Sequence, residues 1–248
     1  MIRPLQITNQ ERSSAMEPVL FYGIPHGCSF GSIVALEWLG QPYRLSRIDM
    51  LASPALYAKV NPSRETPTLL LQDGETLSES FAILQHLAGR DLGRKLGFPQ
   101  GTREHDRLNR VLAYLHTSFH SAFSPAWVAY KLAEGDPLKP ALRDLARDKA
   151  AKGYAHLEAL LAGRDWLDGG DSRTIADAYL VGIARWGEDL GLFELAQAYP
   201  RVHAHLQKLE ADPAVIFAHA IEDGRPAVTG GGFLGHMALD ELVPRLAA

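Results

Sequence analysis

The sequence predicts an α+β protein in which a small mixed-sheet domain precedes an all-helical domain. Between residues 18 and 90, short apolar runs alternate with turn signals and one helical stretch. From residue 102 to about residue 222, apolar residues recur at spacings of three and four, and no strong strand candidate occurs. We therefore expect an N-terminal extension at 1–17, the sheet domain at 18–90, a linker at 91–101, the helical domain at 102–222 and a tail at 223–248.

The first domain is expected to begin with a strand, a helix and a second strand. The apolar run Val19–Tyr22 ends at Gly23 and predicts a buried strand. Apolar residues at helical spacing predict a helix from about Cys28 to Leu39, which Gly40 ends. Residues 43–48 predict a second strand, parallel to the first because a helical crossover joins them.

A hairpin and a second helix complete this domain. Residues 68–72 and 75–77 predict two short strands around Asp73-Gly74, a turn dipeptide that tolerates positive φ. Ser78 is the predicted N-cap of a helix that ends near Gly89. The glycines, proline and charges of residues 91–101 are typical of a connector.

Two features mark the rest of the chain. Thr174 and Asp177 have the spacing of a capping box and predict the start of a helix. In the tail, Gly230-Gly231-Gly232 disfavours a helix, whereas residues 237–246 have an amphipathic helical pattern. The tail could be flexible or could pack over an active-site mouth, and the sequence leaves both possibilities open.

Composition excludes several classes of function. The chain has 25 Lys+Arg against 29 Asp+Glu and a pI near 6.2, so it lacks the basic surface that nucleic acid requires. No apolar run is long enough to suggest a membrane span, and the first 17 residues lack the apolar block of a secretory signal. The single cysteine allows no intramolecular disulfide, and the histidines have no metal-ligand context. We expect a cytoplasmic protein without a metal.

Three ordered blocks carry a resemblance to a known family. They are Leu20-Phe21-Tyr22 with Pro25, Gly27-Cys28-Ser29 and Leu39-Gly40; Asn61-Pro62 with Thr66-Pro67-Thr68-Leu69, Asp73-Gly74 and Glu79-Ser80; and Thr174-Ile175-Ala176-Asp177-Ala178-Tyr179-Leu180 with Arg185-Trp186. Over residues 19–213 the chain resembles the glutathione S-transferases, especially the bacterial beta-like class. The resemblance implies a thioredoxin-like first domain that binds glutathione, a helical domain that holds the second substrate, and a cytoplasmic homodimer. The implied activity is detoxification by addition of the glutathione thiolate to small apolar electrophiles.

The resemblance also implies residues that bind the two ends of glutathione. It places Thr66 and Pro67 at a cis-proline turn, where the Thr66 backbone would pair with the cysteinyl backbone of the ligand. The Ser80 hydroxyl and the helix N-terminus beside it suit the γ-glutamyl carboxylate, and the Glu79 carboxylate suits the ammonium. Glu79 and Ser80 could equally serve as the charged start of a helix, and the two interpretations are compatible.

Cys28 and Ser29 are the candidate catalytic residues, and they point to different reactions. Cys28 lies at the predicted start of the first helix, where free N–H groups would lower the pKa of its thiol. The resemblance implies that this cysteine lies beside the glutathione sulfur and can form a mixed disulfide with it. The Ser29 hydroxyl could instead donate to the glutathione thiolate and keep it ionised. A lone cysteine can also be a small buried apolar residue without chemistry.

Three further candidates lie in the helical domain. His120 matches the histidine that lines the glutathione site in the family, although Ser121 follows it where the beta-like class has a lysine, and Ala113 stands where that class often has an asparagine. Phe123 and Trp127 lie near the expected electrophile pocket, but their helical spacing is also compatible with the core.

The sequence leaves two rival functions open. The first is a glutathione-dependent thiol oxidoreductase or peroxidase that works through a mixed disulfide at Cys28. The second is a transferase-like binding module without turnover. The presence of Cys28, Thr66-Pro67 and Glu79-Ser80 argues against this second rival.

Overall fold

The computed structural model describes residues 17–24, 26–52 and 55–246. Its first part consists of β1 (Val19–Ile24), α1 (Phe30–Leu39), β2 (Tyr43–Asp49), the short 3₁₀ helix η2 (Ala55–Lys59), β3 (Thr68–Leu70), β4 (Thr76–Ser78), α2 (Ser80–Arg90) and η3 (Leu92–Arg94). The predicted strands and both helices are confirmed, as is the parallel pairing of β1 with β2. The antiparallel pairing of β3 with β4 confirms the hairpin.

The start of α2 differs from the prediction. Ser78 is the last residue of β4, and Glu79 occupies the N-cap position with φ of 72°. The prediction that Ser78 caps this helix is therefore wrong. The chain turns from strand to helix at Glu79, with a positive φ that non-glycine residues rarely adopt.

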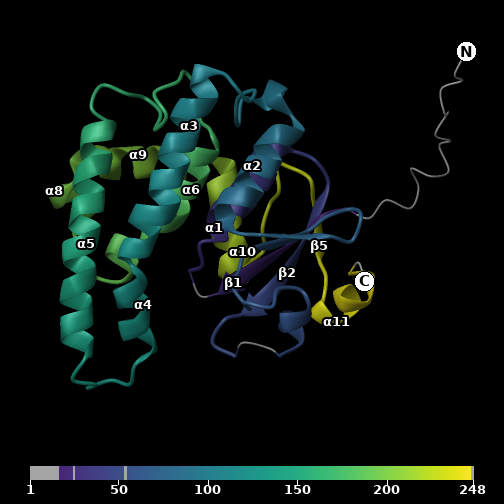
Figure 1. The fold of residues 1–248 in the computed structure, drawn as a ribbon, viewed down its shortest axis with the longest axis horizontal. Coiled ribbons are helices and arrows are strands. Elements are labelled where there is room, and N and C mark those ends of the chain that lie inside the picture. Colours follow the sequence, from purple (N-terminus) through teal and green to yellow (C-terminus); the bar gives the residue numbers. More distant parts are fainter. Residues whose placement is uncertain (1–16, 25, 53–54, 247–248) are drawn as a thin grey trace, which may run out of the picture.

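The helices between residues 103 and 222 lie on one side of the sheet (Figure 1). They are α3 (Arg103–Tyr114), the π-helix η4 (Leu115–His120), α4 (Ser124–Lys131), α5 (Lys139–Leu160), α6 (Ile175–Ala184), α7 (Trp186–Asp189), α8 (Leu195–Ala198), α9 (Pro200–Glu210) and α10 (Pro213–Glu222). The capping box at the start of α6 is confirmed: the Thr174 amide donates to Asp177 Oδ2 at 2.9 Å, and Thr174 Oγ1 accepts from the Ala176 amide at 3.3 Å. No helix in the described residues is long and apolar enough to cross a membrane.

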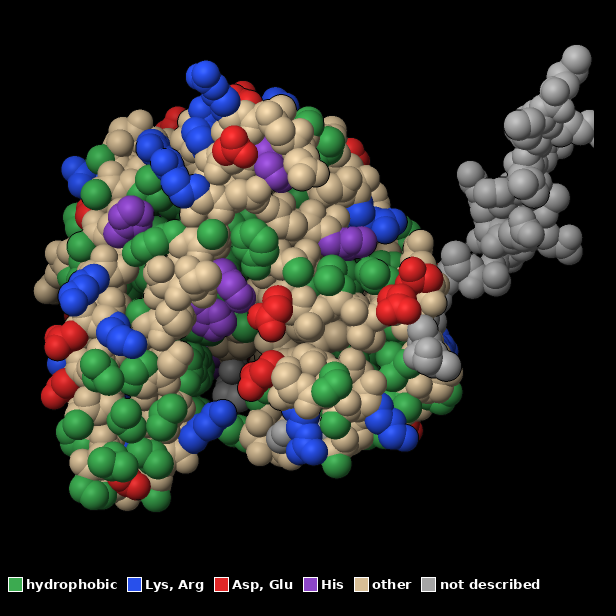
Figure 2. All heavy atoms as spheres, in the orientation of Figure 1, with side chains coloured by type: hydrophobic (Ala, Val, Ile, Leu, Met, Phe, Trp, Pro, Cys, Tyr) green, Lys and Arg blue, Asp and Glu red, His purple; other side chains and the backbone are tan. Residues whose placement is uncertain are grey.

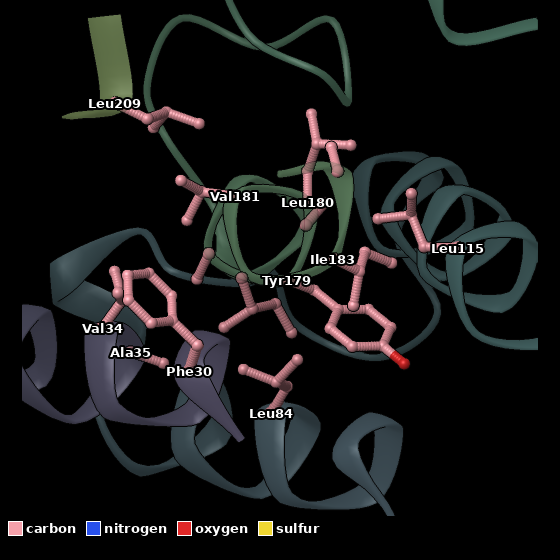
Figure 3. Close-up of a cluster of buried hydrophobic side chains, with 14 of the residues drawn as sticks. Phe30, Val34, Ala35, Leu84, Leu115, Tyr179, Leu180, Val181, Ile183 and Leu209 are labelled. Carbon is pink, nitrogen blue, oxygen red and sulfur yellow. The ribbon is translucent and has the colours of Figure 1, made fainter. Parts of the chain in front are cut away.

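Helix α6 lies at the centre of the large apolar core. Figure 3 shows its side chains surrounded by residues from α1, α2 and the helical domain, including Phe30, Leu84 and Leu115. Contact between α1 and α6 is close because Gly31 and Gly182 lack side chains at the crossing. This packing holds the helical domain against the sheet domain and places the two in fixed positions around the site.

The tail returns to the sheet and adds a fifth strand at its edge. The order is β4-β3-β1-β2-β5, and β5 (Phe233–His236) pairs in parallel with β2. After β5 come the one-turn helix α11 (Leu239–Leu242) and η5 (Val243–Arg245), which replace the longer helix predicted at 237–246. Figure 1 shows this segment beside β2, away from the helices of residues 103–210. The sequence pattern did not predict β5.

A second apolar cluster covers the sheet face opposite α1. Its buried members come from three strands, from η2 and the residues after it, and from α11: Val19, Phe21, Ile48, Tyr57, Val60, Leu70 and Leu242. The side chains of β1 alternate between the two faces, since Leu20 and Tyr22 belong to the large core.

Candidate functional site

Two adjoining cavities lie between the sheet domain and the helical domain. The smaller has a volume of about 220 Å³ and the larger about 380 Å³. They share Cys28, Glu65, Thr66 and His120 in their walls. In Figure 2, histidine side chains gather at one edge of a hollow in this face, and acidic side chains lie across from them.

Most of the residues that line the smaller cavity have polar side chains. The Thr66–Pro67 peptide bond is cis, as the resemblance implied, and both residues line this cavity. Ser80 also lines it; it is the first residue of α2, and only 3% of its surface is exposed. The exposed Glu79 carboxylate lies 3.7 Å from His116 Nε2. Non-glycine residues with positive φ, such as Glu79, concentrate at ligand sites, where the surrounding structure holds them in place.

Cys28 occupies the junction of the two cavities. Its thiol donates a hydrogen bond to the Thr66 carbonyl oxygen at 3.4 Å. Burial raises the pKa of the Cys28 thiol to about 11, although a hydrogen bond with Ser80 acts in the opposite direction. The expectation of a lowered thiol pKa is wrong because α1 begins at Phe30, two residues later, and the loss of hydration outweighs the stabilisation of the charged form. At neutral pH the residue is therefore a thiol and can act as a hydrogen-bond donor.

Ser29 lies inside the protein rather than at the cavity surface. It is fully buried, and its Oγ accepts a hydrogen bond from the Gly23 amide at 3.1 Å. It is absent from the walls of both cavities. The structure thus gives Ser29 a role in holding the loop between β1 and α1.

A cluster of two histidines and a tyrosine borders the smaller cavity. The Tyr179 hydroxyl lies 2.9 Å from His120 Nδ1 and 3.2 Å from His116 Nδ1. Burial and, to a smaller extent, the nearby His116 lower the pKa of His120 to about 4, so His120 is neutral at pH 7. Burial also raises the pKa of Tyr179, with a further increase from Cys28. Sequence reasoning identified His120 but missed the other two; the spacing of four residues between the histidines was the available signal.

Aromatic side chains form much of the larger cavity. Trp127, Tyr130 and Trp186 line it, together with Met50 of the sheet domain and Lys131 of α4. Trp127 was predicted for this pocket. Lys131 was not; it lies one helical turn after Trp127 and supplies a cation that Ser121 does not.

Phe123 does not reach this cavity. It is fully buried, and its ring packs edge-on against Trp186 with 5.5 Å between the ring centres. Phe123 therefore supports the aromatic wall from behind. Within the described residues, no group of three or more His, Cys, Asp or Glu side chains could hold a metal ion.

In the first domain, a cis-proline turn lies beside a cysteine and the N-terminus of a helix. This arrangement on a mixed sheet defines a thioredoxin-like domain, and an all-helical domain follows it. Two family models match the chain: the glutathione S-transferase N-terminal domain at residues 28–90 and the C-terminal domain at residues 113–213. The chain belongs to the glutathione S-transferase family.

Individual relatives support this assignment over most of the chain. Glutathione S-transferase GST-4.5 of Xanthomonas campestris is 32% identical over 173 residues, which cover 69% of this chain and 83% of the relative. GstA of Escherichia coli O157:H7 is 30% identical over 200 residues, covering 79% and 94%. A sphingomonad glutathione S-transferase in complex with glutathione superposes with a TM-score of 0.73 at 30% identity, covering 83% of this chain and 98% of that one. A beta-class enzyme of Sphingomonas chungbukensis gives 0.72 at 27% identity, covering 82% and 98%.

Proposed function

We propose that this protein binds reduced glutathione in the smaller cavity and transfers it to a small apolar electrophile held in the larger one. The observation that carries the proposal is the junction of the two cavities at Cys28, Thr66 and His120. A ligand sulfur at this junction would face both spaces. One is polar enough for a charged peptide, and the other is aromatic enough for an apolar second substrate.

The residues of the smaller cavity suit the parts of glutathione in turn. The Thr66 backbone pairs with the cysteinyl backbone of the ligand, with Pro67 fixing the turn. Ser80 and the N-terminus of α2 bind the γ-glutamyl carboxylate, while Glu79 receives the ammonium. His120 borders the sulfur as a neutral group.

The glutathione thiolate would be stabilised by Cys28 rather than by Ser29. Cys28 remains protonated at neutral pH, and its S–H already points to a backbone carbonyl in the cavity wall. When the ligand amide takes the Thr66 carbonyl, the Cys28 S–H becomes free to donate to the ligand sulfur. The thiolate then attacks the electrophilic carbon, a carbon–sulfur bond forms, and the leaving group departs with its bonding electrons. Trp127 holds the electrophile and keeps water out of the larger cavity.

The first experiment is a calorimetric titration with reduced glutathione, followed by activity measurements with a panel of apolar electrophiles. We expect binding in the micromolar to millimolar range and turnover of at least one electrophile. No binding at millimolar glutathione would contradict the proposal and favour a transferase-like module without turnover. The Thr66→Pro variant, which lacks the backbone N–H at this position, serves as the site control.

Thiol exchange is a second candidate, favoured by the position of the Cys28 sulfur at the junction. In that reaction the Cys28 thiolate attacks a glutathione disulfide, a Cys28–glutathione disulfide forms, and the other thiol leaves as its thiolate. Because the pKa of Cys28 is raised to about 11, the thiolate fraction and the exchange rate would increase about tenfold with each unit increase in pH up to that value. The Cys28→Ser variant separates the two reactions. Conjugation persists in this variant if the thiol is only a donor, whereas exchange is abolished.

We further propose that the protein acts as a cytoplasmic homodimer in detoxification, with domains at 18–90 and 102–222. The support is membership of the family and the match of separate family models to the two parts. Light scattering of the purified protein tests the dimer.

A further inference from the structure

Residues 226–246, here called the C-terminal strap, are fastened to the sheet domain by a buried carboxylate. Glu37 on α1 is 6% exposed. Its carboxylate accepts hydrogen bonds from Thr229 Oγ1 at 2.9 Å and from the amides of Gly230 and Gly231 at 3.0 and 2.9 Å. A Cβ on Gly232 would lie 2.0 Å from the Gln41 carbonyl oxygen. A Cβ on Gly231 would lie 2.7 Å from the Glu37 carbonyl oxygen, so at both glycines the strap passes too close to the backbone of the first domain to allow a side chain.

Beyond these glycines, the strap seals the second apolar cluster. The Met237 amide donates to the Leu45 carbonyl at 2.8 Å, which continues the pairing of β5 with β2. Leu242 of α11 is fully buried in the cluster, and α11 contacts η2. Met237, Leu239 and Val243 pack against the same cluster. The strap is thus the outer cover of this side of the sheet.

The same cluster supports the wall that separates the two cavities. Tyr57 of η2 is buried in it, and the Tyr57 hydroxyl donates to the Glu65 carbonyl at 3.0 Å. Glu65 precedes Thr66, and both line the two cavities. Met50 packs against the cluster, lines the larger cavity and accepts a hydrogen bond at Sδ from Thr66 Oγ1 at 3.5 Å. One continuous set of contacts therefore joins the strap to the cavity wall.

We infer that the C-terminal strap is a positioning element of the substrate site and that Leu242 is a positioning residue, acting through Tyr57 and Met50 on the turn at Thr66. The inference rests on the proposed function, because it concerns the same two cavities. It goes beyond the shared family fold, since the family models end at residue 213 and the strap begins after it.

Leu242→Ala tests this inference in the full-length protein. The lost side chain leaves a space beneath η2 into which Tyr57 and Met50 can relax. We expect the dissociation constant of glutathione and the KM for an electrophile to rise about three- to tenfold, below the ~100-fold that a 1 Å displacement at a reacting centre can cost. The kcat should change less than about twofold, because no group that touches the reacting atoms is altered. Leu242→Met keeps the volume and should restore the wild-type values.

Leu209→Ala is the matched control. Leu209 is a buried leucine in the core around α6 (Figure 3), so its truncation lowers stability without touching the second cluster. All variants are measured at a temperature where circular dichroism shows them folded. If Leu242→Ala and Leu209→Ala lose stability alike and both keep the wild-type binding constants, the strap is only structural and the inference is overturned. If the wild-type protein itself fails to bind glutathione, it is the proposed function that fails.

Discussion

The two faces of the sheet are covered in different ways. The face toward the helical domain packs against α1, α2 and α10, and α6 extends the same core into the second domain. The opposite face is covered by η2 and by the end of the strap, elements of three to five residues each. We infer that the large core supplies most of the stability, whereas the small cluster sets the geometry of the cavity wall. Variants on the two faces should therefore differ in whether they change stability or substrate binding.

The largest loss of stability is expected where α1 crosses α6. A Cβ on Gly31 would lie 2.5 Å from the Ala178 carbonyl oxygen and 2.9 Å from the Tyr179 Cα, and neither backbone atom can move freely. Gly31→Ala should therefore lower the free energy of unfolding by about 3 kcal/mol, as measured by denaturant titration. Gly89→Ala in α2 is the control, because nothing lies within 4 Å of its added Cβ; it should be neutral or stabilising by up to about 1 kcal/mol. Equal stability of the two variants would contradict the tight crossing.

The second prediction concerns pH and the buried histidine on the helical side. The pKa of His120 is about 4 in the folded protein and about 6.5 when unfolded, so the unfolded chain binds the proton first. Stability is therefore lost as the pH falls through 6.5 toward 4. The loss from this residue should reach about 2 kcal/mol by pH 5, at about 1.4 kcal/mol per pH unit. His120→Gln cannot titrate and should lose less between pH 6.5 and 5; parallel curves for the two proteins would refute the assignment.

A smaller and more local effect is expected at the carboxylate that fastens the strap. Glu37→Gln replaces one acceptor oxygen by an amide NH₂, which in the place of Oε2 faces the amides of Gly230 and Gly231, at a cost of about 1.5 kcal/mol. Hydrogen exchange should speed up at the Met237 amide, while the amides of α6 keep their protection. Glu75→Gln, at an exposed residue of the hairpin, should leave both unchanged. Uniform acceleration across the protein would mean that the strap is not a separate unit.

The smallest change in stability is expected for Tyr57→Phe, a variant that should nevertheless weaken glutathione binding. Tyr57→Phe removes a hydroxyl from the Glu65 carbonyl, to which Asn61 Nδ2 still donates at 2.9 Å, so the cost is about 1 kcal/mol. Glutathione affinity should fall because the turn before Thr66 loses one of its two supports. Tyr199→Phe, whose hydroxyl donates to the Ala151 carbonyl on the helical side, should leave affinity unchanged. Calorimetry measures the glutathione affinity of both variants. Equal affinities for Tyr57→Phe and Tyr199→Phe would contradict the different roles of the two faces.

Much of the structure on the sheet face toward the helical domain could be predicted from the sequence, because its elements are long and have local sequence patterns. The strand at Val19, the helix ending at Gly40 and the capping box at Thr174 each have their signal within a few residues. The cover of the opposite face could not be predicted in this way. β5 has four residues with a glycine among them, and it is a strand only because β2 lies beside it.

The candidate site was predictable in its residue types but less so in its electrostatics. Cys28, Thr66, Pro67, Ser80 and His120 all line the smaller cavity. The direction of the Cys28 pKa shift could not be obtained from the sequence, because it depends on how deeply the surrounding loops bury the thiol. The orientation of Ser29 could not be obtained from the sequence either: its neighbour Cys28 faces the cavity, whereas the Ser29 side chain faces the interior.

The pairing of β2 with the strap also has a consequence for biosynthesis. Arg44 donates to the Leu234 carbonyl, a contact between residues 190 positions apart in the chain. During translation, the first domain is therefore made long before the strand that covers its edge. Until residues 233–236 leave the ribosome, β2 presents unpaired N–H and C=O groups to other nascent chains, and such an edge promotes aggregation. Pairing with β5 covers this edge of β2, so translation products that end before residue 233 should be less soluble than those that include β5.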